Sequence, residues 1–316
     1  MMDDRKNIDV PDLILAAGEP LMHPDKFAIS RHARDVGLCV GISIDSMRDT
    51  HDKFRRRQGS FDEAPRGIRM CRGAGINVAL RFTLTQGNRQ DLPGLPRLMH
   101  DEHVNKFYLS HLNYVGRGRK NRRTDLQYQM TREAMELLFS SCWQDVQDGR
   151  RRKFVTGNND ADGVYLLLWA IRYILKHVGY IGSRLTLWGG NSSSVNVSNV
   201  DKFGNIDPDT VWWDYIIVNA KQCRFSKIWL HTLDRLMADL KLESHPVENR
   251  CASCQSHRIY GDNPRTCAWQ LTANFWAENP GCYRNNDEIG IETNQELLQA
   301  TPWKRQSIES ASPLVC

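Results

Sequence analysis

The first half of the chain alternates short apolar runs with longer amphipathic segments. The apolar runs predict strands over residues 12–17, 38–44, 76–84 and 106–112. The segments that follow them predict helices over residues 24–36, 61–74, 92–102 and 132–147. Strands that alternate with helices of about ten or more residues are typical of a parallel sheet with right-handed crossovers. The pattern therefore predicts an α/β fold, in which ligands bind beyond the carboxyl ends of the strands.

Three of the predicted strands end in residues that suit ligand binding. These residues are Gly18 and Glu19 after the first strand, Thr83 and Thr85 at the third, and His111 and Asn113 at the fourth. Because the carboxyl ends of parallel strands share one edge of a sheet, we expect them to form an active site there. The alternative is structural, since threonine suits a strand and a buried histidine can be satisfied within a core.

The pattern changes after about residue 157. Residues 195–215 alternate apolar and polar positions on both sides of a turn at Gly204, which predicts a β-hairpin. A short helix is predicted over residues 226–240, and a loop-rich segment follows. We therefore expect an α/β domain over residues 1–157, a smaller α+β domain over residues 158–292, and a poorly ordered polar tail over residues 293–316.

Four of the nine cysteines gather in one short segment of the second half. They are Cys251, Cys254, Cys267 and Cys282. The first two form a C-x-x-C pair, whose thiolates can hold one metal ion or two corners of an iron–sulfur cluster. The cluster of cysteines favours iron–sulfur, with structural zinc and buried free thiols as the alternatives.

Composition narrows the class of protein. Charged residues make up 25% of the 316 residues and hydrophobic residues 41%, which indicates a soluble globular protein. The longest apolar run, residues 164–171, is too short to span a bilayer, so no membrane partner is expected. The polar start predicts no secretory signal. We therefore expect a cytoplasmic protein with reduced cysteines.

Basic residues form three clusters, although the formal net charge is only +5. The clusters lie at residues 55–57, 117–123 and 150–153. One interpretation is that they are solvated loops and helix ends. The other is a surface that attracts a polyanion. No aromatic interleaving or nucleic-acid motif accompanies them, so we expect no nucleic-acid partner.

Six stretches of the sequence together resemble one family. They are "LILAAGEPLMHPDKFAISRHARDVGL", "THDKFRRRQGSFDEAPRGIRMCRGAGINVALRFTLTQGNRQDLP", "KFYLSHLNYVGRG", "FVTGNNDADGVYLL", "WGGNSSSVNVSNVDKFGNIDPDTVWW" and "ENPGCYRNNDEIG". They are similar to the radical SAM enzymes of heme d1 biosynthesis, the NirJ type, over nearly the whole chain. SAM here is S-adenosylmethionine.

The resemblance implies a fold and a reaction. The fold is a partial (β/α) barrel that binds SAM, followed by a SPASM-like domain with an auxiliary [4Fe–4S] cluster. The reaction removes two propionate side chains from a didecarboxysiroheme-type tetrapyrrole, with an electron-donor protein as a further partner. A substrate that carries carboxylates would give the basic clusters a use.

The resemblance also implies a set of SAM-binding residues. Gly18, Glu19 and Pro20 match the end of a G-G-E-P motif that receives the methionyl ammonium of SAM, and Ala17 stands where the motif has its first glycine. A carboxylate accepts charge-assisted hydrogen bonds from an ammonium, and glycine lets the ligand approach the backbone. The residues implied to face or to lie near the nucleoside are Arg81, Thr83, Thr85, Asn88, His111 and Asn113.

The sequence departs from the family in three ways. The chain contains no C-x-x-x-C-x-x-C loop, whose three thiolates hold the SAM-cleaving cluster in this family. The stretch "GLCVGISIDS" fuses two strands of the family pattern and drops a βα unit between them. Tyr260 stands where the third cysteine of the auxiliary cluster is expected, so Cys267 would have to substitute. We therefore expect an incomplete barrel, N-terminally truncated and internally shortened, that does not cleave SAM unaided.

Two other functions stay open from the sequence. One is a non-catalytic module that binds an iron–sulfur cluster or zinc. The other is a relative that modifies peptides by radical chemistry. The stretches "NYVGRG" and "TGNNDADG" favour the tetrapyrrole branch over the peptide branch.

Overall fold

The computed structural model describes residues 40–44, 46–55, 58–115, 118, 122–126, 128–191, 195–201, 203–231, 234–242, 245–261 and 263–290. The predicted strand over residues 12–17, the predicted helix over residues 24–36, and Gly18, Glu19 and Pro20 lie outside the described residues, as does the predicted tail. The chain divides into two compact units. One holds the described residues up to 112 and those from 124 to 157, and the other holds those from 113 to 123 and from 158 to 290. The domain bounds expected from the sequence stay a prediction.

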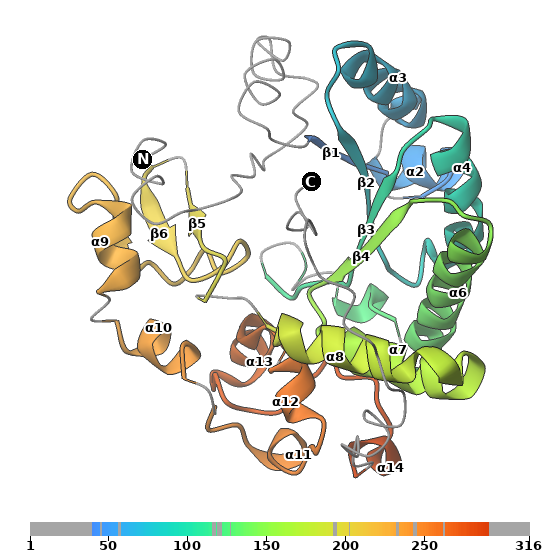
Figure 1. Cartoon of the computed structure of the whole chain (residues 1–316). Helices are drawn as coiled ribbons and strands as arrows, with labels where there is room; N and C mark the ends of the chain where they lie inside the picture. The colour runs from blue at the N-terminus through green and yellow to red at the C-terminus, as the bar shows by residue number, and fades with distance from the viewer. Residues whose placement is uncertain are drawn as a thin grey trace, which may run out of the picture. The chain divides into compact units, whose positions relative to one another are not determined.

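A parallel sheet forms the centre of the first unit (Figure 1). Its strands, in spatial order, are β1 (Val40–Ser43), β2 (Val78–Thr83), β3 (Lys106–Ser110) and β4 (Lys153–Gly157). All three pairings between neighbours are parallel, as the alternation of strands and helices predicts. The strand β4 was not predicted, because the basic cluster at its start obscures the short apolar run.

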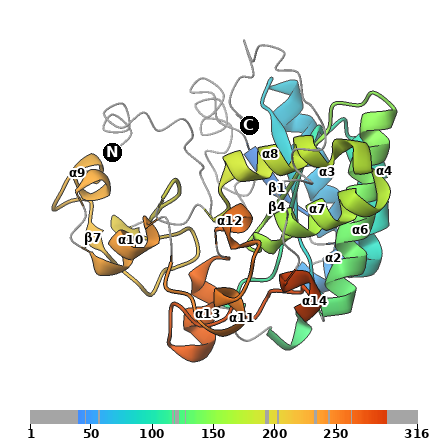
Figure 2. The same cartoon turned by 60° about the horizontal axis from the view of Figure 1, so that its bottom comes forward.

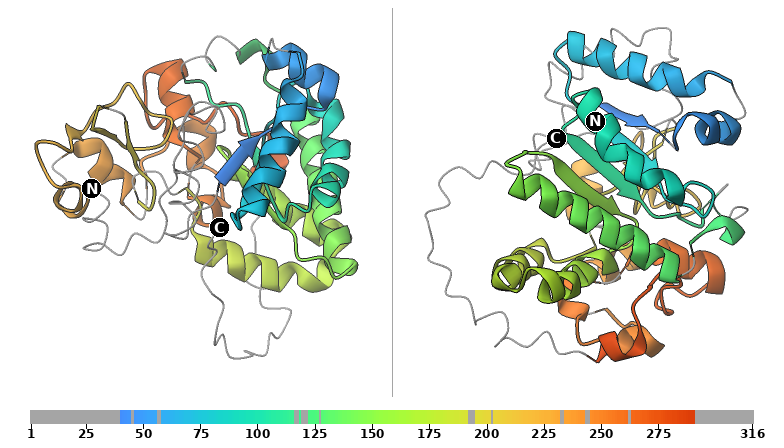
Figure 3. Two further views of the ribbon diagram at one scale, coloured as in Figure 1. Left: turned by 90° about the horizontal axis from the view of Figure 1, so that it is seen from above. Right: turned by 90° about the vertical axis from the view of Figure 1, so that its right-hand side faces the viewer.

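Helices cover one face of this sheet (Figure 1, Figure 3). They are α2 (Arg48–Arg55), α3 (Ser60–Gly73), α4 (Leu95–Asp101), which follows the 3-10 turn η3 (Arg89–Gly94), and α6 (Tyr128–Gln147). Phe107 and Phe154 pack edge to face, with ring centroids 6.1 Å apart, and lie against Leu95 of α4 and Leu138 of α6. Burying one such ring contributes about 2 kcal/mol relative to leaving it exposed.

The carboxylate of Asp52 fixes the start of α3. It accepts hydrogen bonds from the backbone amides of Gly59 (2.6 Å) and Phe61 (2.8 Å) and from the hydroxyl of Ser60 (2.8 Å). The hydrogen bond from Phe61 is the main cause that holds the pKa of Asp52 below its usual value. An aspartate on α2 thus satisfies amide groups that the first turn of α3 leaves without helical partners.

The second unit combines two longer helices with several short helices and strands (Figure 2). The longer helices are α7 (Ala161–Tyr173) and α8 (Val178–Trp188), joined by the turn η5 (Leu175–His177). The strands β5 (Asn199–Val200), β6 (Asn205–Asp207) and β7 (Val218–Asn219) pair antiparallel. The remaining helices are α9 (Phe225–Leu230), α10 (Arg235–Leu240), α11 (Asn249–Ala252), α12 (His257–Tyr260), α13 (Arg265–Thr272) and α14 (Asn286–Ile289).

Two predictions for this unit can be compared with the structure. The hairpin predicted over residues 195–215 is present as β5 and β6, and its turn is held by Asp201, which accepts hydrogen bonds from the amides of Phe203 and Asn205. The single helix predicted over residues 226–240 is wrong. The chain forms α9 and α10 instead, because the Asp234 side chain caps a new helix start by accepting a hydrogen bond from the Met237 amide.

An aromatic cluster makes the core beneath α10. Trp212 is fully buried with Leu236 and Leu240. The rings of Trp269 and Phe275 stack at 4.2 Å against this cluster. The cluster gives Trp212 and Trp269 a structural role in the core of the second unit. No helix in the described part of the chain is both long enough and apolar enough to cross a membrane.

A buried carboxyl in the hairpin predicts a pH effect on stability. Burial raises the pKa of Asp207 to about 6, although the Asn199 amide donates a hydrogen bond to one of its oxygens. The other oxygen is buried with no hydrogen-bond partner among the described residues. The pKa of Asp207 is higher in the folded protein than in the unfolded one. The fold is therefore most stable below the unfolded pKa, where the carboxyl is protonated in both states, and it loses stability as pH rises to about 6.

We therefore expect Asp207→Asn to stabilise the protein at pH 7 by about 2 kcal/mol and to remove the loss of stability with rising pH. Urea unfolding at a series of pH values measures both effects. The exposed Asp287, replaced by Asn, is the control and should leave the pH dependence in place. An Asp207→Asn variant with an unchanged pH dependence would show that this carboxyl is not the source.

Candidate active site and cysteine cluster

The face of the parallel sheet opposite to α2, α3, α4 and α6 carries a row of polar and aromatic side chains. Strand register aligns Arg81 with Tyr108, and Thr83 with Ser110 and Gly157. Because side chains alternate along a strand, these residues lie on the face opposite to the buried Phe82 and Phe107. This places two of the sequence-predicted residues, Arg81 and Thr83, on one face near the carboxyl ends of the strands.

Tyr108 is a neighbour of this row that the sequence analysis did not single out. The guanidinium carbon of Arg81 lies 5.2 Å from the centroid of the Tyr108 ring, a cation–π contact. A Cβ atom at Gly157 would lie only 1.9 Å from the Tyr108 hydroxyl oxygen. Glycine at the end of β4 thus leaves room for the Tyr108 ring, which in turn holds Arg81.

The loop after β2 is shaped by Asn88. Its side-chain oxygen accepts a hydrogen bond from the Thr85 amide (2.8 Å), and its side-chain nitrogen donates to the Thr83 carbonyl (2.8 Å). Both Asn88 and Thr85 are buried. Asn88 therefore has a structural role, and its contact with a nucleoside stays a prediction, as does that of Thr85.

The two predicted residues after β3 differ in their surroundings. His111 is buried, and its backbone amide donates to the Gly157 carbonyl (3.0 Å), which extends the pairing of β3 with β4. Both polar atoms of the Asn113 side chain are buried and have no hydrogen-bond partner among the described residues. Buried amides are nearly always hydrogen-bonded, so the Asn113 side chain fits a ligand that offers both a donor and an acceptor.

Tyr260 lies among three of the predicted metal ligands. Cys251, Cys254 and Cys282 are all buried, and the Tyr260 phenol forms a hydrogen bond with Cys254. Burial raises the pKa of this phenol far above its usual value, and the nearby thiols raise it further. The residue that replaces an expected cysteine is therefore a neutral phenol, and it lies beside the predicted ligands.

A buried arginine, Arg284, contacts Cys254. Its Nη1 donates to the Cys254 sulfur at 3.1 Å, and its Nη2 donates to Ser256 (3.2 Å) and to the Glu288 carbonyl. Only 2% of Arg284 is exposed, and no carboxylate within the described ranges pairs with it. A buried guanidinium requires nearby negative charge, which thiolates or a metal–thiolate centre would supply. This residue was missed by sequence reasoning, although it follows Cys282 closely.

The geometry of the cysteines does not by itself define a metal site. Across the residues that the structure describes, no group of three or more Cys, His, Asp or Glu side chains is arranged to hold a metal ion. The fourth predicted ligand, Cys267, is buried on α13. The donor chemistry fits an anionic centre because of Arg284, and the ligand set, including Cys267, stays a prediction.

Comparisons with known proteins complete the description. The chain matches no family model. It is 39% identical to pre-heme d1 synthase of Dinoroseobacter shibae, over 96% of this chain and 81% of that protein. It is 30% identical to Fe-coproporphyrin III synthase of Methanosarcina barkeri, over 92% of this chain and 80% of that protein.

Solved structures are similar in fold at low sequence identity. Native anSMEcpe with bound AdoMet, which is SAM, superimposes with a TM-score of 0.60 at 13% identity, over 89% of this chain and 72% of that one. SuiB of Streptococcus suis bound to its precursor peptide SuiA superimposes with a TM-score of 0.64 at 12% identity, over 90% of this chain and 67% of that one. The predicted α/β fold of the radical SAM type is confirmed.

Proposed function

We propose that this chain is a radical SAM protein of heme d1 biosynthesis. It belongs to the family of pre-heme d1 synthase. The observation that carries this proposal is the 39% identity to pre-heme d1 synthase along 96% of the chain. We further propose that its substrate is a didecarboxysiroheme-type tetrapyrrole, from which two propionate side chains are removed. An electron-donor protein would be its other partner.

The sheet face that carries Arg81 and Thr83 would bind SAM. Arg81, held by its contact with Tyr108, offers a cation to a carboxylate at the carboxyl edge of the sheet. The buried, unsatisfied amide of Asn113 offers a donor and an acceptor to a nucleoside. Gly18, Glu19 and Pro20 would receive the methionyl ammonium. The roles of Thr83, Thr85, Asn88 and His111 in this site are part of the same proposal.

We propose that this chain alone binds SAM without cleaving it. No C-x-x-x-C-x-x-C loop occurs in its 316 residues, and that loop would hold the iron–sulfur cluster that supplies the electron for cleavage. The test is anaerobic reconstitution with iron, sulfide and a chemical reductant, followed by two measurements, SAM binding and release of 5′-deoxyadenosine. We expect saturable binding that Arg81→Met weakens about tenfold, with no 5′-deoxyadenosine.

The control for this test is Arg97→Met, which removes an exposed arginine from α4 and should leave SAM binding unchanged. Clear release of 5′-deoxyadenosine would contradict the claim that the chain cannot cleave SAM. A lack of saturable SAM binding would contradict the role of the sheet face.

The cysteine site would hold an auxiliary iron–sulfur centre. Cys251, Cys254 and Cys282 are the proposed ligands, with Cys267 as the candidate for a fourth. Arg284 supports this proposal, because its buried charge would balance that of the thiolates. When bound, such a centre supplies electron transfer, and the surrounding residues keep it away from water.

Tyr260→Cys is expected to increase the iron and sulfide bound by each chain after anaerobic reconstitution. The reason is that a thiolate would replace a neutral phenol beside Cys254. Metal analysis and the visible absorption spectrum measure the change. The matched control is Tyr260→Phe, which keeps the ring and removes the hydroxyl, and which should bring no gain. Equal iron in the two variants would mean that position 260 is not a ligand position.

A non-catalytic binding module is the second candidate function. It is favoured by the lack of the three-cysteine loop in the sequence and by Tyr260 at an expected ligand position. A colourless protein with bound zinc would support this module. A coloured protein with bound iron and sulfide would support the auxiliary iron–sulfur centre.

A further inference from the structure

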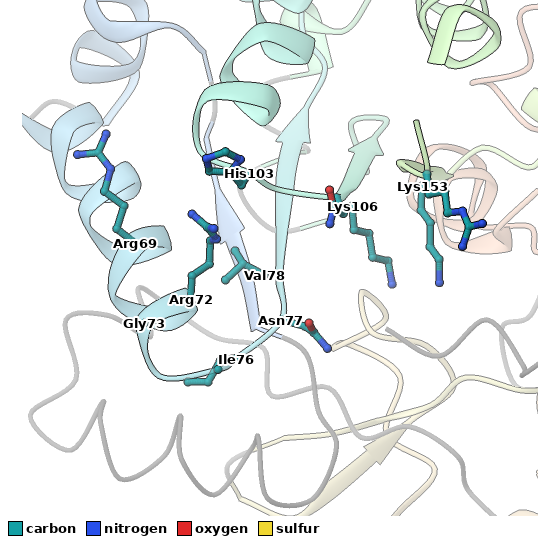
Figure 4. A pocket seen from close by; sticks show the side chains of 12 residues that line it. Arg69, Arg72, Gly73, Ile76, Asn77, Val78, His103, Lys106 and Lys153 are labelled. Carbon is teal, nitrogen blue, oxygen red and sulfur yellow. The ribbon is translucent and has the colours of Figure 1, made fainter. Parts of the chain in front are cut away.

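A basic pocket opens at the amino-terminal edge of the parallel sheet, where β2, β3 and β4 begin (Figure 4). Its volume is about 880 Å³. Six of its lining side chains are cationic or can become so, namely Arg69, Arg72, His103, Lys106, Arg151 and Lys153. No lining residue is an aspartate or a glutamate. The pocket lies at the opposite end of the strands from the proposed SAM site.

The basic cluster at residues 150–153 divides into two pairs with different roles. Arg150 and Arg152 turn toward the buried carboxylate of Asp145 and form ion pairs with it. Arg151 and Lys153 alternate with them along the chain, are exposed, and line the pocket. Structural ion pairs therefore account for Arg150 and Arg152, whereas Arg151 and Lys153 supply positive charge to the pocket.

Two lysines on adjacent strands lie side by side in the lining of the pocket. Lys106 and Lys153 are register partners on the adjacent strands β3 and β4. Figure 4 shows both side chains pointing the same way, into the pocket. Both lysines therefore bring positive charge to the same part of the pocket, where one anion can contact both.

The α3 side of the pocket adds one further cation. Arg69 forms a forked ion pair with Glu102, so its charge is already balanced. Arg72 is exposed in the last turn of α3 and forms no ion pair with any residue of the described ranges. A cation there also suits the negative end of the helix dipole. Arg72 can therefore stay in place without a ligand and remains available to one.

We propose that this pocket binds a small multivalent anion that carries phosphate or carboxylate groups. The lining holds no Phe, Tyr or Trp on which a nucleobase or a macrocycle could stack. Recognition therefore rests on charge and on hydrogen bonds from lysine, arginine, Asn77 and Asn105. This site is independent of the proposed heme d1 role, because it uses other residues at the other end of the strands.

Isothermal titration of the full chain with pyrophosphate and, separately, with citrate tests the proposal. We expect saturable binding of at least one, weakened about tenfold or more by Lys153→Gln and by Lys106→Gln. Comparison of the two anions distinguishes phosphate from carboxylate as the preferred group. The matched control is Arg66→Gln, which removes an exposed cation of α3 outside the pocket and should leave the affinity unchanged.

Thermal unfolding separates a loss of binding from a loss of folding. Without anion, Lys153→Gln should unfold at about the same temperature as the unsubstituted chain, because Lys153 is exposed and surface substitutions change stability little. Added pyrophosphate or citrate should raise the melting temperature of the unsubstituted chain more than that of Lys153→Gln. The proposal is overturned if neither anion binds saturably, or if Arg66→Gln loses as much affinity as the two lysine variants.

Discussion

Gly190→Ala is expected to destabilise the second unit by about 3 kcal/mol or more. Gly190 has φ +82°, which an L-residue adopts only at a cost of about 1–2 kcal/mol. A Cβ atom there would also lie 1.8 Å from the carbonyl oxygen of Tyr260. The backbone fixes the position of this Cβ atom, and its neighbour is a backbone oxygen that also accepts a hydrogen bond from the Asn191 amide, so no side-chain movement can relieve the clash.

The preceding glycine is the matched control for this prediction. Gly189 also has a positive φ, +72°, but a Cβ atom there would meet nothing within 4 Å. Gly189→Ala should therefore cost only about 1–2 kcal/mol, which is the conformational term alone. Urea unfolding followed by tryptophan fluorescence measures both variants. Equal losses would show that the contact with Tyr260 does not matter.

Asp145→Ala is expected to destabilise the first unit by about 3–5 kcal/mol. The Asp145 side chain is only 3% exposed and receives hydrogen bonds from Arg150 (2.7 Å) and Arg152 (2.5 Å). Arg152 is itself 10% exposed and also donates to the Pro96 carbonyl. Removing the carboxylate would leave a largely buried guanidinium without its charge partner. Asp148→Ala, which removes an exposed partner of Arg150, is the control and should cost less than about 1 kcal/mol.

The same carboxylate gives this prediction a dependence on pH. Burial would raise the pKa of Asp145, but the hydrogen bonds and charges of Arg152 and Arg150 outweigh burial and hold the pKa below its usual value. The ion pairs therefore stabilise the fold fully above the unfolded pKa of about 3.9, and this stability is lost as pH falls through the lower folded pKa. As pH falls, the difference in the free energy of unfolding between Asp145→Ala and the unsubstituted chain should therefore shrink. A constant difference down to the lowest pH would contradict the ion-pair explanation.

The sequence predicts the first unit better than the second. Periodicity over β2, β3, α3 and α6 is strong, because each presents one apolar face to the same core. The strand β4 was missed because its neighbours Arg150 and Arg152 are basic for a tertiary reason, the buried Asp145. No local pattern could show that partner.

The candidate sites show the same limit. Arg81 and Thr83 could be placed on one face from alternation alone, whereas their neighbour Tyr108 becomes visible only through strand register. The four cysteines are evident from their spacing. Arg284 is not, because a charge that faces Cys254 across 30 residues of sequence leaves no periodic signal.

The hydrogen bonds of Asn88 have a consequence for the thermodynamics of ligand binding. They tie the end of β2 to the loop that follows it, on both sides of Leu84, through groups that are buried. The loop at this edge is therefore already ordered before a ligand binds, so that binding costs little conformational entropy of the loop. Removing that amide should therefore make binding entropically less favourable even where every atom that contacts the ligand is retained.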